Sequence, residues 1–331
     1  MIVSPAIIAL LGGGLLVVGF AIYAAMTGLR IVHCWDLASG SALQLDLERR
    51  TYLVSTILTV VMLFEIFSLF LFVYTADHLH PLFAGAMCAA GTLNVNGYGY
   101  PLLVVKIFSV LGCGIWLIVN QADNQAEDYP LIRFKYRLLF AVTALLAVGA
   151  LLQTLYFKGL AANVITSCCG TLFSAGADNL AGEIAALPFG TTRLLFFLAA
   201  ALHVRTALHL LVTGRGGRLF GWFSAAYFAA ALVAVISFIS VYYYELPTHH
   251  CPFDLLQGGY HFIGYPLYAT LFTFGITGMA AGLLDRFTAL PSLARRLPAL
   301  QRRYAWISLT GGLLFLGLAL YPMIFGDFRL S

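Results

Sequence analysis

Charged residues are scarce in this 331-residue chain: only 10% are Asp, Glu, Lys or Arg, whereas 61% are hydrophobic. A soluble domain carries about 25% charged residues, so this composition excludes an ordinary soluble fold. Apolar runs of about 20 residues, the length that spans the hydrocarbon of a bilayer, recur along the sequence. The net charge of +4 is spread over short segments between these runs and does not indicate a nucleic-acid partner. The sequence therefore predicts an integral membrane protein.

Nucleotide-binding and catalytic signatures are absent as well. The sequence contains no Walker phosphate loop, dinucleotide fingerprint, Gly-x-Ser-x-Gly elbow, His-Glu-x-x-His helix or Cys-x-x-Cys-His haem attachment. No segment between apolar runs is long enough to form a nucleotide-binding domain. The chain alone therefore gives no positive indication of an enzyme, and energy input has to come from a partner, an ion gradient or a redox couple.

The apolar runs predict a single polytopic membrane domain, residues 1–331, with eight transmembrane helices. Because a backbone in lipid has to satisfy its hydrogen bonds internally, the spans are expected to be α-helices. The predicted fold class is therefore an all-α integral membrane protein. The predicted spans are 5–29, 52–75, 101–120, 138–157, 190–213, 220–244, 263–284 and 304–324.

The distribution of basic residues predicts the orientation. One set of loops holds 13 of the 18 Lys and Arg residues, whereas the other side holds only Lys158, Arg193 and Arg329. Positive residues concentrate in cytoplasmic loops, so both termini are expected outside. The protein is expected in the cell membrane, which is the inner membrane of a Gram-negative cell. The outer hairpin loops, which then face the periplasm or exterior, are about 76–100, 158–189 and 245–262.

These three outer loops are rich in cysteine and histidine. With their helix ends they hold five of the eight histidines and four of the six cysteines, in about a quarter of the chain. Thiolate and imidazole suit Cu(I) or Zn(II), and four such ligands complete a tetrahedral zinc site. Cys-x-x-Cys is absent, so the ligands would have to meet in space. The candidate metal ligands are His78, His80, Cys88, Cys169, His249, His250, Cys251 and His261.

Disulfides are a second interpretation of the same cysteines. Four cysteines in an oxidising compartment pair in three possible ways. The vicinal pair Cys168-Cys169 can reach both Cys88 and Cys251 and so join all three loops. A partial repeat favours convergence of the loops, because Gly-Thr-Leu follows the cysteines of the first two loops and Gly-Tyr-Pro recurs in the first and third. The two interpretations are compatible, since histidines can bind a metal beside disulfides.

Glu65 and Lys106 are charged residues inside predicted spans. An isolated charge near the middle of a span costs about 2.5–3.5 kcal/mol. The depths of the two residues differ by about 6 Å at the helical rise per residue, within reach of a lysine side chain. We therefore expect an intramembrane ion pair, with a proton or ion pathway or a quinone contact as the alternative.

Haem b or a quinone is the second cofactor hypothesis. The fifth span holds His203, Arg205 and His209, and Arg205 and His209 share a helix face because they are four residues apart. A b-type haem needs axial ligands at equal depth on different helices, and His33 and His209 both lie near the predicted cytoplasmic boundary. A hydrogen-bonded contact between helices is the alternative for each histidine.

The sequence thus favours a multi-pass membrane subunit whose outer Cys/His loops bind copper or zinc, or dock an extracytoplasmic metal or redox partner, within a larger assembly. One alternative is a quinone- or haem-binding subunit of an electron-transfer complex. The other is a transporter permease that uses Glu65 and Lys106. The expected partners are the lipid bilayer and other membrane or extracytoplasmic protein subunits.

Overall fold

A computed structural model describes residues 4–37, 39–161, 163–166, 173 and 180–329. These residues form helices and no strand, and eight of the helices are long and apolar enough to cross a membrane. The all-helical prediction with eight spans is therefore confirmed for this part of the chain. The eight helices, several with short continuations, are α1 (Pro5–Cys34), α2 (Ala42–Leu79), α4 (Gly99–Asp123), α5 (Ile132–Lys158), α8 (Phe189–Thr213), α9 (Gly217–Ala234), α11 (Gly264–Leu284) and α12 (Leu297–Phe325).

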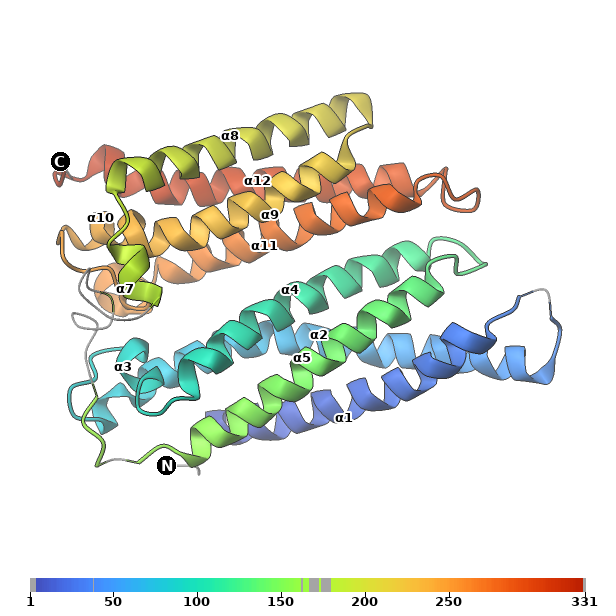
Figure 1. Cartoon of the computed structure of the whole chain (residues 1–331), viewed down its shortest axis with the longest axis horizontal. Helices are drawn as coiled ribbons and strands as arrows, with labels where there is room; N and C mark the ends of the chain where they lie inside the picture. Colours follow the sequence, from blue (N-terminus) through green and yellow to red (C-terminus); the bar gives the residue numbers. More distant parts are fainter. Residues whose placement is uncertain (1–3, 38, 162, 167–172, 174–179, 330–331) are drawn as a thin grey trace. The chain divides into compact units, whose positions relative to one another are not determined.

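The contacts divide the chain into two compact units, which are described in turn. Unit 1 contains α1, α2, α4 and α5 and comprises Met1–Thr75, Asn96–Ala161 and Phe287–Leu297. Unit 2 contains α8, α9, α11 and α12 (Figure 1) and comprises Ala76–Val95, Ala162–Arg286 and Pro298–Ser331. The last turn of α2 belongs to unit 2.

In unit 1, α5 packs against both α1 and α4. Gly28 of α1 lets this packing be close, because a Cβ atom there would lie 2.5 Å from the Tyr136 ring. Small residues permit such an approach between membrane helices, whose association depends on packing rather than on the hydrophobic effect. Gln153 of α5 also donates a hydrogen bond to the Leu10 carbonyl of α1, at 2.7 Å. Trp116 and Tyr136 are fully buried in the core of this unit.

Glu65 of α2 and Lys106 of α4 form a buried ion pair within unit 1. Lys106 Nζ lies 3.1 Å from Glu65 Oε1 and donates a second hydrogen bond to Ser68 Oγ, at 2.9 Å. The two charged residues are 6% and 4% exposed. Each charge therefore has a partner inside the apolar part of the protein, as the cost of an isolated intramembrane charge requires.

A second buried ion pair joins the end of α4 to the start of α5. Lys135 Nζ lies 2.7 Å from Asp123 Oδ2, and both side chains are fully buried. The other carboxylate oxygen, Asp123 Oδ1, accepts a hydrogen bond from the Leu131 amide at 2.8 Å and so closes the turn. Lys135 precedes the predicted span 138–157 and so counts among the 13 basic loop residues, but the helix begins at Ile132 and the lysine side chain is buried.

Unit 2 is held together by small residues and by an aromatic core. Gly221 of α9 and Gly282 of α11 meet so closely that a Cβ atom on Gly282 would lie 2.4 Å from the Gly221 Cα. Ser308 of α12 donates to the Phe274 carbonyl of α11, at 2.8 Å. The aromatic core contains Phe196, Tyr227, Phe274 and Phe315.

The continuation of α9 leads into the loops of unit 2. A π-helical turn, η2 (Val235–Ile239), follows α9 and passes into α10 (Ser240–Tyr244). Such turns interrupt the regular i→i−4 hydrogen-bond pattern and are frequent near functional sites. The His250 ring donates a hydrogen bond through Nδ1 to the Ile236 carbonyl of this turn, at 3.0 Å, and thereby fastens the following loop to the helix.

The buried Glu65–Lys106 pair predicts a large effect of removing one partner alone. Lys106→Met leaves the Glu65 carboxyl without its cation and is expected to lower the free energy of unfolding by about 3–5 kcal/mol. The double variant Glu65→Leu/Lys106→Met is expected to regain most of this loss. Thermal unfolding of the detergent-solubilised chain measures both effects.

The matched control for this experiment is the exposed pair of Arg50 and Asp46 on the same helix α2. Asp46→Asn is expected to change the unfolding temperature little, because solvent screens exposed ion pairs. A Lys106→Met variant as stable as the wild type would show that the pair contributes nothing to the fold.

Candidate functional site

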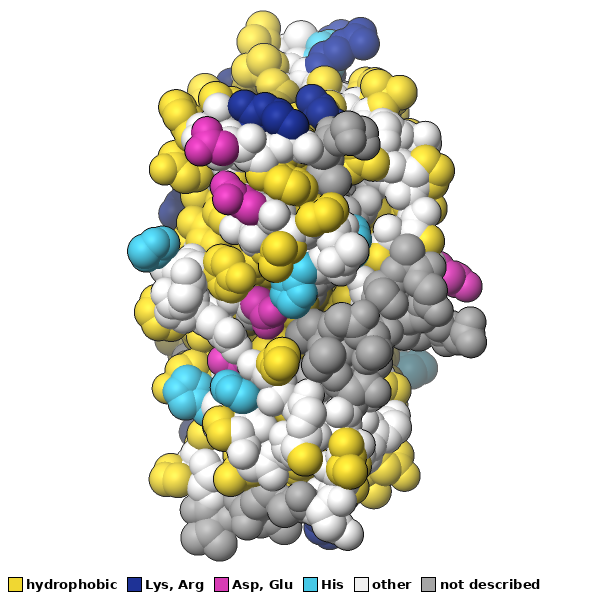
Figure 2. All heavy atoms as spheres, turned by 90° about the vertical axis from the view of Figure 1, so that its left-hand side faces the viewer, with side chains coloured by type: hydrophobic (Ala, Val, Ile, Leu, Met, Phe, Trp, Pro, Cys, Tyr) yellow, Lys and Arg dark blue, Asp and Glu magenta, His cyan; other side chains and the backbone are white. Residues whose placement is uncertain are grey.

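The candidate site is built from three segments of unit 2. They are residues 76–95, the stretch at Thr166, and residues 245–263. Figure 2 shows the side of the molecule on which these segments lie, with histidine and acidic side chains among apolar ones on its surface. The segments contain two short helical pieces, α3 (Ala89–Leu93) and η3 (Asp254–Leu256), and α3 is completely buried.

Two hydrogen bonds from Thr166 hold its segment against residues 84–91. The Thr166 amide donates to the Ala84 carbonyl at 2.9 Å, and its hydroxyl donates to the Gly91 carbonyl at 2.8 Å. Gly85 makes this approach possible, because it has a positive φ of 87° and a Cβ atom there would lie 2.3 Å from the Thr166 oxygen. Backbone and side chain together therefore fix the position of the segment that carries Cys88.

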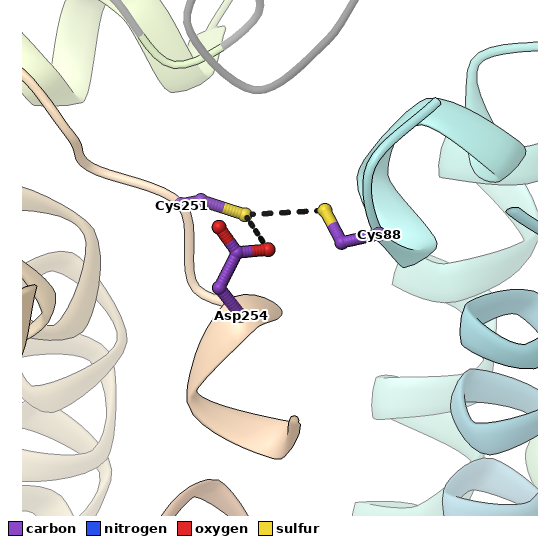
Figure 3. A group of neighbouring side chains, drawn as sticks. All are labelled: Cys88, Cys251 and Asp254. Carbon is purple, nitrogen blue, oxygen red and sulfur yellow. Dashed lines mark hydrogen bonds between the residues drawn. The ribbon is translucent and has the colours of Figure 1, made fainter. Parts of the chain in front are cut away.

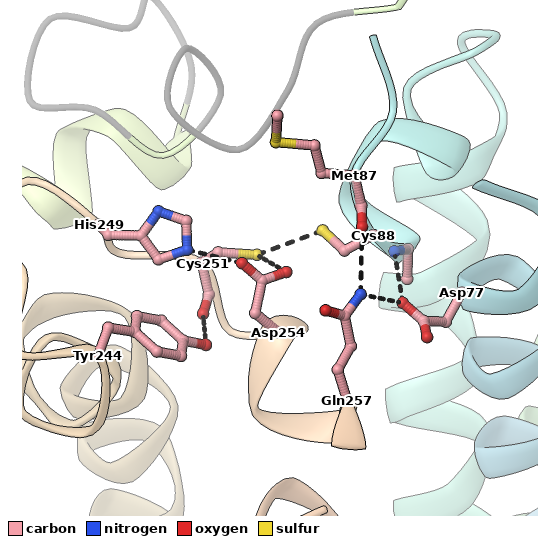
Figure 4. Close-up of polar contacts among 9 residues, drawn as sticks. Asp77, Met87, Cys88, Tyr244, His249, Cys251, Asp254 and Gln257 are labelled. Atoms are coloured by element: carbon pink, nitrogen blue, oxygen red, sulfur yellow. Dashed lines mark hydrogen bonds and ion pairs between the residues drawn. The ribbon is translucent and has the colours of Figure 1, made fainter. Parts of the chain in front are cut away.

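Asp77 and Gln257 join residues 76–95 to residues 245–263 (Figure 4). Asp77 Oδ1 accepts hydrogen bonds from the Ala89 amide and from Gln257 Nε2, each at 3.1 Å. Gln257 Nε2 also donates to the Met87 carbonyl at 3.1 Å. These bonds lie on both sides of Cys88 and hold it against the third segment.

Two tyrosines hold the backbone around Cys251. Tyr244 donates from its hydroxyl to the Cys251 carbonyl, and Tyr268 donates to the Pro252 carbonyl, each at 2.6 Å. Tyr244 is the last residue of α10, and Tyr268 lies in α11. The two helices that flank the loop therefore position Cys251 directly.

The result is a cluster of two thiols and one carboxylate (Figure 3). Cys88 Sγ lies 3.6 Å from Cys251 Sγ, although the residues are 163 positions apart in the chain. The Cys251 thiol donates to Asp254 Oδ1 at 3.5 Å. The three potential ligand atoms lie within 4.8 Å of one another. Both cysteines are fully buried, and Asp254 is 9% exposed.

His249 completes the cluster from its more exposed side. Its Nε2 atom lies 2.6 Å from Asp254 Oδ2, the oxygen opposite to the one that faces Cys251. The His249 ring also packs edge-on against the Tyr244 ring, with centroids 4.7 Å apart. Asp254 is thus held by an imidazole on one oxygen and by a thiol on the other (Figure 4).

The environment lowers the pKa of Asp254. Burial alone raises this pKa, but hydrogen bonds from His249, Cys88 and Cys251 favour the carboxylate and together outweigh burial. The carboxylate is therefore the stable form at neutral pH.

Two sulfur atoms and one anionic oxygen in this geometry can bind a thiophilic cation. The sulfur atoms are also close enough to form a disulfide after a shift of about 1.5 Å, since a bonded pair is about 2.05 Å apart.

The structure brings together only part of the predicted ligand set. Among the described residues, the ligand-type cluster contains Cys88, Cys251 and Asp254, with His249 bonded to the carboxylate. The other histidines have different surroundings: His80 bonds through Nδ1 to the Asp77 carbonyl and His250 to the Ile236 carbonyl, while His78 and His261 are exposed. Cys168 and Cys169, predicted as a disulfide partner pair with Cys169 also a metal candidate, lie outside the described residues.

The histidines proposed for haem or quinone also have local partners. His33 Nδ1 bonds to the Leu29 carbonyl of its own helix at 2.8 Å. His203 is fully buried in the aromatic core of unit 2, with Nδ1 3.2 Å from Ser224 Oγ. Arg205 and His209 are exposed on α8. Because His33 belongs to unit 1 and His209 to unit 2, their pairing around a haem stays a prediction.

Several residues that hold the site together were not identified from the sequence, among them Asp77, Tyr244, Asp254 and Gln257. Asp254 carries a usable signal, because Cys251-Pro-Phe-Asp254 is a Cys-x-x-Asp spacing that a single turn brings together. Tyr244 lies in a run of three tyrosines that resembles an aromatic belt at a membrane surface. Asp77 and Gln257 are 180 residues apart, so no local pattern links them.

The lowered pKa of Asp254 predicts a pH-dependent contribution to stability. A carboxyl group whose pKa is lower in the folded state stabilises the fold above its unfolded pKa, and this stabilisation is lost as the pH falls through the folded value. Asp254→Asn is therefore expected to lower the unfolding temperature at pH 7. The difference from wild type should shrink below about pH 4, near the ordinary pKa of aspartate. Thermal unfolding at a series of pH values measures it.

The control variant is Glu183→Gln, which removes an exposed carboxyl group of the same unit. It is expected to leave the pH profile unchanged. Equal unfolding temperatures of Asp254→Asn and wild type from pH 7 to pH 4 would contradict the role given to His249 and the two thiols.

Comparison with known proteins adds no family to this geometry. No protein-family model, curated protein or solved structure matches the chain. The chemistry of the site therefore follows from its own residues: a buried dithiol with an ionised carboxylate, held between loops of an eight-helix, membrane-type chain.

Proposed function

We propose that this chain is a multi-pass membrane subunit whose cluster of Cys88, Cys251 and Asp254 binds a thiophilic cation, Zn(II) or Cu(I). The convergence of two buried sulfur atoms and a carboxylate within 4.8 Å carries this proposal. Thiolates favour Cu(I) and Zn(II) over harder cations. Carboxylate oxygens also bind zinc in proteins, as do cysteine and histidine.

His249 supports the cation site from outside. In metal centres the ligating carboxylates are themselves hydrogen-bonded, and such partners orient the ligand. His249 occupies Asp254 Oδ2 and leaves Oδ1, which faces Cys251, for the cation. With one more ligand, from His249 after a ring movement, from water or from a partner, the coordination becomes tetrahedral.

The concentration of basic residues in the opposite set of loops supports an outer location of this cluster. An outer, buried site with soft ligands suits a subunit that receives a metal ion from, or passes it to, an extracytoplasmic protein. Because the sequence contains no nucleotide-binding motif, the chain would perform this task within a larger assembly.

Metal analysis of the purified chain tests this proposal. After expression with zinc or copper, the wild type is expected to hold about one ion per chain in the proposed site, and Cys88→Ser or Cys251→Ser is expected to reduce it to background. Replacement by cobalt should give the absorption of a thiolate–cobalt bond in the wild type and not in Cys88→Ser or Cys251→Ser. Cys113→Ser and His78→Ala, which lie outside the cluster, serve as controls and should keep the ion. A wild-type chain without metal, or Cys251→Ser with full metal content, would refute the site.

A dithiol–disulfide pair is the second candidate function, and the 3.6 Å sulfur separation favours it. In this reaction a disulfide of a partner protein or of glutathione accepts two electrons and two protons from Cys88 and Cys251. A Cys88–Cys251 disulfide forms, and the oxidant leaves as two thiols. The chain would then relay electrons to or from an extracytoplasmic thiol protein.

Mapping of disulfides by mass spectrometry tests the second candidate. The double variant Cys168→Ser/Cys169→Ser, treated with glutathione disulfide, is expected to give a peptide that links Cys88 to Cys251. Bound zinc should slow this linkage, because the metal occupies the same sulfur atoms. If the linked peptide forms only when Cys168 and Cys169 are present, the pair acts through those cysteines rather than directly.

A further inference from the structure

Five arginines lie at one end of unit 2, where α8 leads into α9, α11 ends and α12 begins (Figure 1). The stretches concerned are 213–222, 285–286 and 298–306, and all three belong to unit 2. All five arginines are exposed, and Asp285 is the one acidic residue in the sequence of these stretches. This end of unit 2 therefore carries a strong excess of positive charge. The arginines are Arg215, Arg218, Arg286, Arg302 and Arg303.

Glycines let the turn between α8 and α9 approach the start of α12. A Cβ atom on Gly217, the first residue of α9, would clash with the Gln301 side chain of α12. A Cβ atom on Gly214, which follows α8 and has a positive φ of 69°, would lie 3.1 Å from Arg302 Nη2. The Arg302 guanidinium therefore lies against the turn that carries Arg215, although the two arginines are far apart in the sequence.

This positive charge is compensated only in part within the described protein. Arg218 Nε lies 3.6 Å from Asp285 Oδ2, and the Arg218 side chain is 67% exposed. In the described part of the chain, the other four arginines form no ion pair. Gathered like charges repel one another and destabilise the compact state. The preference of basic residues for one side of a membrane explains arginines in loops, but it does not require three distant stretches to converge. A bound anion would offset the repulsion.

Two exposed tryptophans lie one helical turn away from these arginines. Trp222 lies four residues after Arg218 in α9, and Trp306 lies four residues after Arg302 in α12. Residues four apart share a helix face, so each tryptophan lies about 6 Å further along its helix than its arginine. Trp222 is 74% and Trp306 55% exposed. Tryptophan concentrates at the headgroup level of a bilayer, which places the arginines beside the lipid headgroups.

The order of groups on this surface matches the order of groups in a phospholipid. Guanidinium groups come first, then the indole rings, and then apolar side chains such as Leu219, which is 60% exposed. A phospholipid presents its phosphate, its glycerol esters and its acyl chains in the same sequence. Arginine binds phosphate oxygens through paired hydrogen bonds, and clusters of basic residues beside transmembrane helices bind anionic headgroups. An acidic protein segment would match the arginines alone.

We propose that the five arginines bind the phosphate of an anionic phospholipid, with Trp222 and Trp306 beside its glycerol and the upper part of its acyl chains. The phosphate joins the turn after α8 to the start of α12 and so stabilises unit 2 in membranes that contain anionic lipid. By the predicted orientation, this lipid belongs to the cytoplasmic leaflet, where anionic lipids are concentrated. The site shares no residue with the cysteine cluster and does not depend on the function proposed for that cluster.

Quenching of tryptophan fluorescence by brominated lipids tests the site in the full-length chain. The purified protein is reconstituted into phosphatidylcholine vesicles that contain brominated phosphatidylglycerol in one arm and brominated phosphatidylcholine in the other. The remaining tryptophans, Trp35 and Trp116, are buried, so quenching reports chiefly on Trp222 and Trp306. Brominated phosphatidylglycerol is expected to bind more tightly than brominated phosphatidylcholine, by about fivefold for each arginine that contacts the phosphate.

Charge-removing variants show whether the arginines cause this preference. Arg215→Gln/Arg302→Gln is expected to lower it at least about fivefold, whereas Arg215→Lys/Arg302→Lys, which keeps both charges, should retain most of it. The matched control is Arg49→Gln/Arg50→Gln, which removes two exposed arginines from α2 in unit 1 and the same net charge. It should leave the preference unchanged. Circular dichroism of each variant checks that the helices are intact.

A preference that the Arg215/Arg302 glutamine variant loses and the control keeps supports the site. Equal quenching by the two brominated lipids overturns it and leaves an acidic protein as the partner of the arginines. An equal loss in both glutamine variants also overturns it, because general surface charge would then explain the preference. Inorganic phosphate, added at constant ionic strength, should not abolish the preference. If it does, the arginines take free phosphate rather than a lipid, and the proposal fails.

Discussion

The structure depends on one constraint: a polar group inside apolar helices has to find its partner within the protein. Water cannot solvate it there, and an unpaired group costs several kcal/mol. Glu65 meets Lys106 and Ser68, and Asp123 meets Lys135 and the Leu131 amide. The same rule explains the loops, where tyrosine hydroxyls and Gln257 satisfy carbonyls that no helix can satisfy. The ion pairs and hydrogen bonds that satisfy the buried polar side chains therefore also hold the helices and loops together.

This constraint also identifies where function is expected. Where every polar group is paired, as around Lys106, the arrangement is explained by folding alone. In the cysteine cluster, by contrast, the partners of the Asp254 carboxylate include two thiols, a residue type that can also bind a metal or form a disulfide. Stability does not need two buried thiols beside an ionised carboxylate, because apolar side chains of the same size would pack there without a charge to compensate.

The number of spans was predictable from the sequence because each apolar run carries its own evidence, independent of the rest of the chain. The helix ends were not. α2 begins at Ala42, ten residues before its predicted span, since helix-forming charged residues such as Glu48 continue the helix beyond the apolar run. Lys135 shows the same error, because α5 begins at Ile132, six residues before its predicted span, and the lysine counted as a loop charge is buried. Removing it from the basic count leaves 12 residues against three, so the predicted orientation is unaffected.

The sequence indicated which types of residue gather in the loops, but it did not indicate which individual residues meet in the cysteine cluster. Clustering of cysteine and histidine in three loops indicated the segments that hold Cys88 and Cys251, but the proximity of these two residues depends on a contact over 163 positions of the chain. Asp254 was not among the predicted ligands, although it lies three residues after Cys251 and accepts a hydrogen bond from its thiol.

The structure also changes which residues are the best candidates for metal ligands. The predicted metal ligands included five histidines beside three cysteines. In the structure, however, His80 and His250 bond to backbone carbonyls, and His249 is the histidine seen to reach the cluster among the described residues, through Asp254. A cation would therefore be held chiefly by sulfur. Metal ligands have to be deprotonated, and Asp254 with its lowered pKa is already ionised at neutral pH. The protons released on binding would then come from the thiols, and the affinity would rise with pH through the range in which thiols ionise.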